Sequence, residues 1–319
     1  MKRAASTVLA AALLTAAAPA PAIAPLVAPA PAAVLPAEWT AAPVIPLWPK
    51  GRLPDVQPKP PVAMPNLPKV FVQSVAQPSL HMFRPEKPNG RAILTIPGDG
   101  YFFVSVANEG VDVARRFTKL GYTVYVLVYR LPGEGWADRA DVPLQDARRA
   151  VRLMKSRATA DGFDAGRIGV LGFSAGGHLA ASLATDDSAD VPVDAIDGLS
   201  ARPQAVGLIY PVITMGEKTN ATSRTLLLGR DLSAELVERR SAERHVDAST
   251  PPLFLFHSVD DTTVPVENSQ MMFDAMRTAR RPVEMHLVQE GGHGYGTGFA
   301  GTPSAMWPDL FDAWLSRQP

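Results

Sequence analysis

The sequence predicts an α/β fold: a mostly parallel sheet of eight strands with helices on both faces. From about residue 69 to the end of the 319-residue chain, short apolar runs rich in β-branched residues alternate with helical segments, which is typical of a parallel sheet covered on both faces. Hydrophobic residues make up 46% of the chain, enough for a large core. The polar, charge-rich stretch 212–250 interrupts the alternation. We expect it to form a small insertion over the carboxyl edge of the sheet, where ligands bind in such folds.

The individual elements follow from apolar periodicity and from the turn residues between them. Strands are expected at 70–75, 80–83, 92–96, 123–129, 167–171, 205–210, 253–257 and 283–288. Helices are expected at 109–119, 144–157, 175–184, 267–278 and 303–316. The first helix has Val113, Phe117 and Leu120 at three- and four-residue spacing, as one buried helical face requires.

The first 68 residues differ from the rest of the chain. Residues 1–24 have the pattern of a signal peptide, with a basic start, a small apolar run over 8–18 and a small-x-small site at 22–24. This run is too short to cross a bilayer, which needs roughly 20 residues, so we expect no membrane insertion and export to the periplasm or the cell exterior of a bacterium. A buried N-terminal helix is the alternative. Residues 25–68 are predicted to form a partly disordered proline- and alanine-rich arm, and residues 69–319 the main domain.

Composition excludes several classes of function. The 31 basic and 31 acidic residues balance, so the chain has no basic surplus for a phosphate backbone, and nucleic acid is not an expected partner. The absence of cysteine excludes disulfides, thiolate metal sites and a cysteine nucleophile. We expect no metal and no cofactor.

The strongest motif is Gly172-Phe173-Ser174-Ala175-Gly176, which joins an apolar strand to a helix rich in small residues. A serine on so sharp a turn needs flanking glycines, because side chains there would collide with the strand and the helix. The turn exposes the hydroxyl at a helix N-terminus, where free N–H groups favour negative charge. We interpret Ser174 as a nucleophile; the alternative is a simple strand-to-helix turn.

A serine nucleophile needs a base and an acid that orients the base. We assign the base to His293, in the glycine-rich loop 291–296, in preference to His178, expected to pack in its helix, and His257, which ends a strand. The acid is Asp260 or Asp261, since adjacent side chains point apart, and we choose Asp261. The alternative for His293 is that it lies in a flexible glycine-rich loop and has no catalytic role. The backbone N–H of Ala175 is one expected donor to an oxyanion.

These motifs, in this order, resemble the α/β-hydrolase esterases, in particular their exported acetyl esterase and acetylxylan-esterase-like branch. Weaker matches lie at 45–48, 121–122, 129–132, 210–212 and 267–269, so the resemblance covers most of residues 44–300. It implies a serine esterase with the order serine, acid, histidine, and assigns further oxyanion donors to the N–H groups of Asp99 and Gly100. Relatives usually have three glycines in this loop; here Asp99 places a carboxylate beside the developing oxyanion, which would oppose it unless turned away or neutralised.

Aromatic residues suggest how a sugar ester could bind. Several of the candidate aromatics lie in loops that lead from strand ends, although the same residues could equally pack in the core; the candidates are Tyr101, Phe102, Phe103, Trp136, Tyr295 and Trp307, of which Tyr101, Trp136 and Tyr295 are preferred. The resemblance and the expected export favour a short-chain ester, acetyl above all, on a plant polysaccharide or oligosaccharide. Two alternatives stay open: a prolyl-oligopeptidase-like peptidase, and a non-catalytic binding module that retains the fold. The oligomeric state is not predicted.

Overall fold

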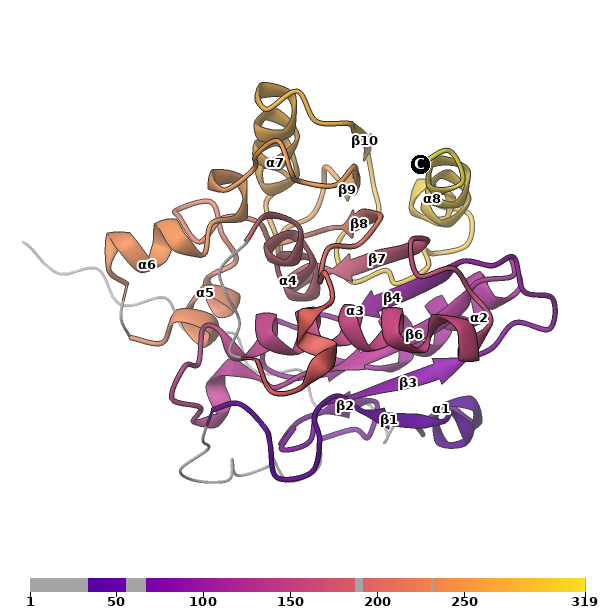
Figure 1. Ribbon diagram of the computed structural model, residues 1–319. Helices are drawn as coiled ribbons and strands as arrows, with labels where there is room; N and C mark the ends of the chain where they lie inside the picture. The colour runs from indigo at the N-terminus through magenta and orange to yellow at the C-terminus, as the bar shows by residue number, and fades with distance from the viewer. Residues whose placement is uncertain (1–33, 56–66, 187–191, 231, 319) are drawn as a thin grey trace, which may run out of the picture. The chain divides into compact units, whose positions relative to one another are not determined.

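Eight strands form one sheet in the order β1-β3-β6-β4-β7-β8-β9-β10 (Figure 1). β1 pairs antiparallel with β3, and β3 pairs antiparallel with β6. All remaining neighbours are parallel. The strands span Val44–Pro46 (β1), Ser79–Phe83 (β3), Ala92–Ile96 (β4), Thr123–Val128 (β6), Ile168–Phe173 (β7), Ala205–Ile209 (β8), Leu253–Ser258 (β9) and Val283–Val288 (β10). This arrangement confirms the predicted fold class.

The structure is a computed structural model that describes residues 34–55, 67–186, 192–230 and 232–318. The described residues belong to one compact unit, which begins at residue 32. The predicted signal peptide 1–24 and part of the predicted arm lie outside the described residues. None of the helices in the described ranges combines the length and the apolar character needed to span a bilayer.

One predicted strand of the sheet is wrong. The run 70–75 contributes only β2, Phe71–Val72, which pairs with β5, Val104–Ser105, in a separate two-stranded sheet. The eighth strand of the main sheet is β1, which lies in the predicted arm and pairs in register with β3, from Val44 opposite His81 to Pro46 opposite Ser79. A proline is compatible with this position because β1 is an edge strand, where one side of the backbone needs no partner.

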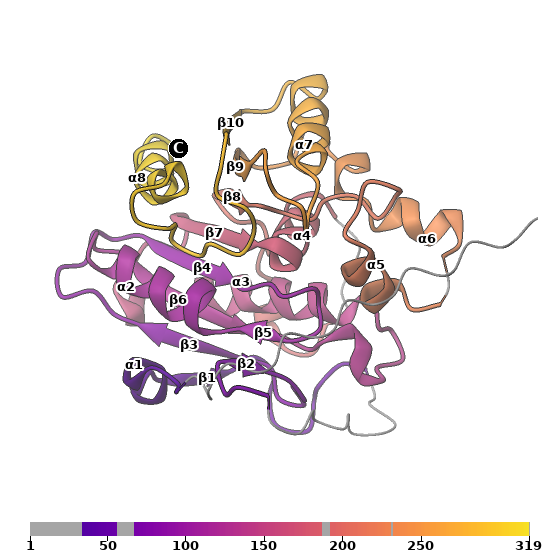
Figure 2. The same ribbon diagram turned by 180° about the vertical axis from the view of Figure 1, so that it is seen from behind.

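Helices cover both faces of the sheet (Figures 1 and 2). Val142–Asp161 (α3) and Ser174–Thr185 (α4) pack on one face and share a hydrophobic cluster with Glu267–Thr278 (α7). Asp112–Thr118 (α2) and Trp307–Leu315 (α8) cover the other face with a second cluster, centred on Phe117, Trp307 and Phe311. These two layers bury β4, β6, β7, β8 and β9 completely, which explains their continuous apolar sequence.

The segment before β2 is fixed to this core by buried polar contacts. It contains the short helix α1, Ala37–Ala41, and continues through β1 to Trp48. The indole Nε1 of Trp48 donates to Asp146 Oδ1 at 2.7 Å. The same carboxylate pairs with the buried guanidinium of Arg130 at 2.8 Å, and Arg149 Nε donates to the carbonyl of Leu47 at 2.8 Å. Satisfied hydrogen bonds of this kind are what allow charged groups to be buried.

The interrupted stretch 212–250 forms Ala221–Leu228 (α5), Ala234–Arg239 (α6) and a short 3-10 turn, Ala242–Arg244. Figures 1 and 2 show α5 and α6 beyond the carboxyl ends of the parallel strands. The start of α5 reaches two loops of this edge. A Cβ on Gly100 would lie 3.4 Å from Cγ2 of Thr222, and Asn220 Nδ2 donates to the carbonyl of Thr263 at 3.0 Å.

Candidate active site

Ser174 lies at the turn between β7 and α4 with φ of +51°. The turn is so tight that flanking side chains would not fit. A Cβ on Gly172 would lie 2.5 Å from Cβ of Ala180, and one on Gly176 would lie 2.2 Å from the carbonyl oxygen of Ile96. Such contacts are impossible without backbone movement, so the glycines are steric requirements of the turn. Ser174 itself is only 7% exposed.

The structure brings Ser174, Asp261 and His293 together. His293 Nε2 lies 2.9 Å from Ser174 Oγ, and His293 Nδ1 lies 2.6 Å from Asp261 Oδ2. Since a carboxylate only accepts, Nδ1 carries the ring proton and Nε2 is free to accept the hydroxyl proton of the serine. This chain of hydrogen bonds can deprotonate the serine as it attacks a carbonyl carbon.

Asp261 is held by more than His293. Its Oδ1 accepts from the backbone N–H of Thr263 at 2.8 Å and of Val264 at 2.9 Å, and its Oδ2 contacts His257 Nε2 at 3.1 Å. Burial alone would raise the pKa of Asp261, but the hydrogen bonds from His257 and His293 outweigh it and hold this pKa well below its usual range. The carboxylate therefore stays ionised beside the histidine.

Asp260 has a different role. Its Oδ1 accepts from the backbone N–H of Gly292 at 2.8 Å, and its Oδ2 from that of Gly291 at 3.3 Å. It therefore fastens the loop of His293 rather than the ring. Gly291 adopts φ of +154°, a conformation that side chains rarely allow, and a Cβ there would lie 2.3 Å from Ser258 Oγ.

The loop after β4 lies directly against Ser174. A Cβ on Gly98 would be 2.8 Å from Cβ of Ser174 and 3.2 Å from the backbone N of Ala175. Among the described residues, the N–H groups of Asp99, Gly100 and Ala175 donate to no protein acceptor. Gly98 thus brings the loop that contains Asp99 and Gly100 against the turn of Ser174, and the N–H groups predicted as oxyanion donors have no protein partner among the described residues.

Asp99 adopts φ of +96°, a conformation that favours glycine. Burial raises the pKa of Asp99 to about 6, against the lowering effects of the Ser105 hydroxyl and His293. Asp99, Tyr101, Ser174 and Tyr210 are four of the seven described non-glycine residues with positive φ. Backbone strain is thus concentrated at this site, as is common at functional sites.

The predicted sugar-binding aromatics Tyr101, Trp136 and Tyr295 are buried in the structure. Tyr101 is 1% exposed, and its hydroxyl contacts His178 Nδ1 at 2.8 Å. Trp136 is buried with the Arg130 guanidinium 5.2 Å from its ring centroid, and Tyr295 is buried edge-on against Tyr210. The alternative of core packing therefore describes these three. Phe102, next to Tyr101, is 40% exposed.

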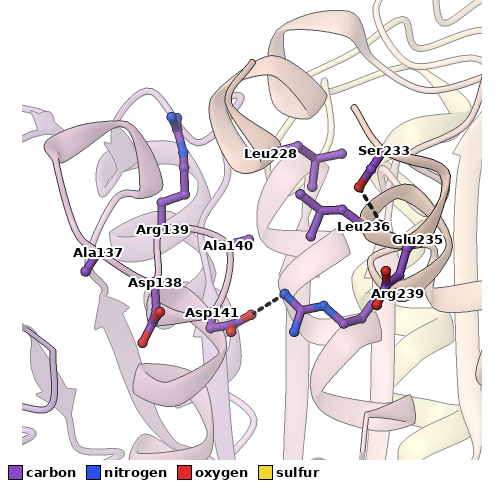
Figure 3. A pocket seen from close by; sticks show the side chains of 10 residues that line it. All are labelled: Ala137, Asp138, Arg139, Ala140, Asp141, Leu228, Ser233, Glu235, Leu236 and Arg239. Atoms are coloured by element: carbon purple, nitrogen blue, oxygen red, sulfur yellow. Dashed lines mark hydrogen bonds and ion pairs between the residues drawn. The ribbon is translucent and has the colours of Figure 1, made fainter. Parts of the chain in front are cut away.

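A separate cavity of about 460 Å³ lies between residues 137–141 and the insertion (Figure 3). Asp138, Asp141 and Arg239 line it, and Asp141 lies 3.6 Å from Arg239. Leu228, at the end of α5, also lines it, whereas Thr222 near the start of α5 contacts the oxyanion loop. At 1.5 Å per helical residue the cavity is therefore roughly 9 Å along α5 from that loop. The residues that line it do not include Ser174, Asp261 or His293.

Sequence reasoning missed three residues that support the site: Glu109, Tyr210 and His257. The sequence did carry a signal for His257, which ends a strand four residues before the assigned acid, Asp261. Its Nε2 faces two acceptors, Asp261 Oδ2 and the carbonyl of Val264, while its Nδ1 lies 2.8 Å from Ser269 Oγ. Nε2 therefore carries a proton, which the ring donates to Asp261. In the described ranges, no group of three or more His, Asp or Glu side chains is arranged to hold a metal ion.

The chain is similar in sequence to known proteins. Over 204 residues the chain is 36% identical to endo-1,4-beta-xylanase B of Butyrivibrio fibrisolvens, matching 63% of this chain and 32% of that protein. Over 221 residues it is 33% identical to an acetylxylan esterase of Xylanibacter ruminicola, matching 68% of this chain and 43% of that protein. The chain thus matches less than half the length of either relative.

A solved acetyl ester-xyloside bifunctional hydrolase from Caldicellulosiruptor lactoaceticus superimposes with a TM-score of 0.72 at 34% identity, covering 86% of this chain and 96% of that one. A propionate-bound esterase from Thermogutta terrifontis superimposes with a TM-score of 0.63 at 25% identity, covering 76% and 89%.

The fold, the site and these likenesses define the class: a protein with the α/β-hydrolase fold that is similar to carboxylic ester hydrolases of the acetylxylan-esterase-like branch. Residues 80–276 match the family model BD-FAE. The chain therefore belongs to the BD-FAE family.

Proposed function

We propose that the protein is an exported serine esterase that removes short-chain acyl groups, acetyl above all, from plant polysaccharide or oligosaccharide. The observation that carries the proposal is the position of His293, which is hydrogen-bonded to Ser174 Oγ at 2.9 Å and to Asp261 Oδ2 at 2.6 Å. A hydroxyl, an imidazole and an ionised carboxylate in this sequence form the arrangement that acyl transfer requires.

In the first half of the reaction, Ser174 Oγ attacks the ester carbonyl carbon while His293 Nε2 takes the hydroxyl proton. The carbonyl oxygen becomes an oxyanion, and we assign its stabilisation to the N–H groups of Ala175, Asp99 and Gly100. The intermediate then collapses as the bond to the leaving alcohol oxygen breaks. His293 returns its proton to that oxygen, and the alcohol leaves behind an acyl group on Ser174.

In the second half, water replaces the alcohol. His293 Nε2 takes a proton from the water as its oxygen attacks the acyl carbon, and the same donors stabilise the second oxyanion. Collapse breaks the bond to Ser174 Oγ, to which His293 returns the proton. The products are one carboxylic acid and the free enzyme, and Asp261 remains ionised throughout.

The substrate class rests on weaker support. Two relatives are named as a xylanase and an acetylxylan esterase, and a similar solved structure is named as a hydrolase of acetyl esters and xylosides. Phe102, 40% exposed beside the oxyanion loop, offers a flat apolar face to a sugar ring or an acyl group. Export is supported by the basic and apolar pattern of residues 1–24.

The test is hydrolysis of p-nitrophenyl acetate, butyrate and octanoate, followed by release of acetate from acetylated xylan. We expect activity on the acetate that falls with chain length, and a loss of roughly 10⁵–10⁶ in kcat for Ser174→Ala. Feruloylated arabinoxylan and a proline-containing peptide anilide serve as competing substrates. Faster cleavage of the anilide would favour the peptidase, and a folded wild-type protein without hydrolysis of any of these would leave only the binding module.

A further inference from the structure

Glu109 is buried behind the oxyanion loop, with 3% of its surface exposed. Its Oε2 accepts a hydrogen bond from the backbone N–H of Gly98 at 2.6 Å, and its Oε1 accepts one from the hydroxyl of Tyr210 at 2.9 Å. The same hydroxyl accepts from the backbone N–H of Gly296 at 3.0 Å. One carboxyl group therefore connects the oxyanion loop, the end of β8 and the loop that carries His293.

The backbone around Glu109 is specialised for this contact. A regular helix is expected from residue 109, but residues Ala107–Val111 form a π-helical turn. The N–H of Val111 donates to the carbonyl of Val106 at 2.9 Å, five residues back. π-Helical turns insert one extra residue into a helix and are frequent at functional sites. The carbonyl of Glu109 itself accepts from Thr95 Oγ1 of β4 at 2.8 Å.

Tyr210 extends the connection to the base. Its ring packs edge-on against the ring of His293, with centroids 4.8 Å apart. The backbone of Tyr210 adopts φ of +39°, which is strained for a large side chain. The ring of Tyr210 therefore packs against His293, and its hydroxyl accepts from Gly296 in the His293 loop. Glu109 fixes this hydroxyl by accepting its hydrogen bond.

We propose that Glu109 is a positioning residue for ester hydrolysis: its carboxyl group fixes the peptide of Gly98, so that the following N–H groups face the oxyanion, and it steadies the His293 loop through Tyr210. The inference rests on the proposed function. Gly98 is in van der Waals contact with the turn of Ser174, so a small rotation of its peptide would move the donors of Asp99 and Gly100. Misplacing such groups by an ångström can cost a hundredfold in rate.

The carboxyl group of Glu109 is buried and held by hydrogen bonds. Burial raises the pKa of Glu109 well above its usual range, and the nearby carboxyl of Asp99 raises it further. No ion pair of Glu109 occurs within the described part of the chain. Without a cation partner, burial of this carboxyl costs free energy that no ion pair within the described residues offsets. The hydrogen bonds that it accepts from Gly98 and Tyr210 are what hold it in place.

The test compares Glu109→Leu, Glu109→Gln and Tyr210→Phe, with p-nitrophenyl acetate as the substrate. We expect Glu109→Leu to lower kcat by roughly 10²–10³-fold, as loss of an oxyanion donor does. KM should stay within about threefold of the wild-type value, because Glu109 acts on the oxyanion loop and not on substrate binding. Glu109→Gln keeps an acceptor for Gly98 and should retain more than about a tenth of kcat. Tyr210→Phe leaves the Gly98 contact intact and should lower kcat only about tenfold.

A second readout is the rate at which diethyl p-nitrophenyl phosphate captures Ser174, which should fall in parallel with kcat. The matched control is Asp161→Leu, a buried carboxyl at the end of α3 that pairs with Arg84 and Arg157. It should lower Tm and leave kcat unchanged.

Three results would overturn the positioning role. If the wild type is active and Glu109→Leu has the same kcat, the positioning role is wrong and the proposed function still stands. The role is also wrong if kcat falls only in proportion to the fraction of folded protein, measured by circular dichroism, and Glu109→Gln restores none of it. A folded wild type that hydrolyses no ester would overturn the proposed function and the positioning role together.

Discussion

Asp260 and Asp261 are adjacent in the chain, yet they hold the histidine loop at two different points. Asp261 Oδ2 lies 2.6 Å from the ring nitrogen Nδ1 of His293, whereas Asp260 Oδ1 accepts from the backbone N–H of Gly292 at 2.8 Å. One carboxylate therefore orients the ring and the other fixes the backbone that carries it. This division makes the two residues a matched pair for separating orientation from support.

Asp261→Asn is expected to lower kcat about 10⁴-fold, because an amide no longer enforces the tautomer with the proton on Nδ1 or stabilises the imidazolium. Asp260→Asn keeps one acceptor oxygen for the loop and should lower kcat less than about tenfold. Steady-state kinetics on p-nitrophenyl acetate checks both, with Tm as the control for folding. Equal losses in the two variants would contradict the assignment of Asp261 as the orienting acid.

His257 is expected to help fix the carboxylate of Asp261 by a hydrogen bond, without contacting the substrate. It is fully buried, and its Nε2 lies 3.1 Å from the carboxylate oxygen that His293 also contacts. His257→Leu removes this donor and should lower kcat roughly tenfold, since hydrogen bonds to charged groups contribute about 1.5–3 kcal/mol. His257→Gln retains an N–H donor and should recover part of the loss. If both variants match the wild type in kcat, the contact has no influence on the reaction.

Asp99→Gly is expected to leave the rate on an acetyl ester unchanged or to raise it, because it removes a carboxyl from beside the oxyanion and suits the φ of +96°. The stability effect should depend on pH. The folded pKa of Asp99 is raised to about 6, so between about pH 4 and 6 the folded state binds more protons than the unfolded state, and stability falls as pH rises.

Removing Asp99 removes this penalty. The gain in urea midpoint should therefore be larger at about pH 8 than at about pH 4. A large fall in kcat for Asp99→Gly would instead reveal a positive role for the carboxyl. Asp138→Gly, at the exposed rim of the separate cavity, is the control for introducing a flexible residue.

Sequence patterns predicted the elements that have strong periodicity. The helix 267–278 begins and ends where expected, and so do the strands 92–96 and 283–288. The convergence of Ser174, Asp261 and His293 could be expected because the carboxyl ends of parallel strands meet at one edge of the sheet. Their chemical roles stay predictions, which the experiments above address.

What the sequence did not reveal depends on long-range packing. Whether Tyr101 or Tyr295 faces a substrate or the core is decided by neighbours far along the chain, such as His178 and Tyr210. The role of Glu109 depends on a π-helical turn that periodicity cannot distinguish from an α-helix. β1 was not predicted because proline is incompatible with an interior strand, and the sequence does not show that this segment lies at the edge of the sheet.

The N-terminal segment is expected to make the fold sensitive to acid through His81. The ring of His81, on β3, stacks on Trp39 of α1 with centroids 3.6 Å apart, and burial lowers its pKa to about 4 although a hydrogen bond to the Trp39 backbone opposes the shift. The unfolded chain has a histidine pKa of about 6.5. Between these values the unfolded state binds more protons, so stability is lost as pH falls from about 6.5 to about 4.

His81→Phe keeps the stacking on Trp39 and cannot be protonated, so its urea midpoint should fall less than that of the wild type between about pH 7 and about pH 4.5. Part of the acid sensitivity should remain, because burial also lowers the pKa of His178 to about 4. His245→Gln, whose contact with the Glu238 carbonyl is exposed to solvent, is the matched control and should retain the full wild-type loss. Equal losses in His81→Phe and His245→Gln would show that protonation of His81 does not couple the N-terminal segment to the sheet.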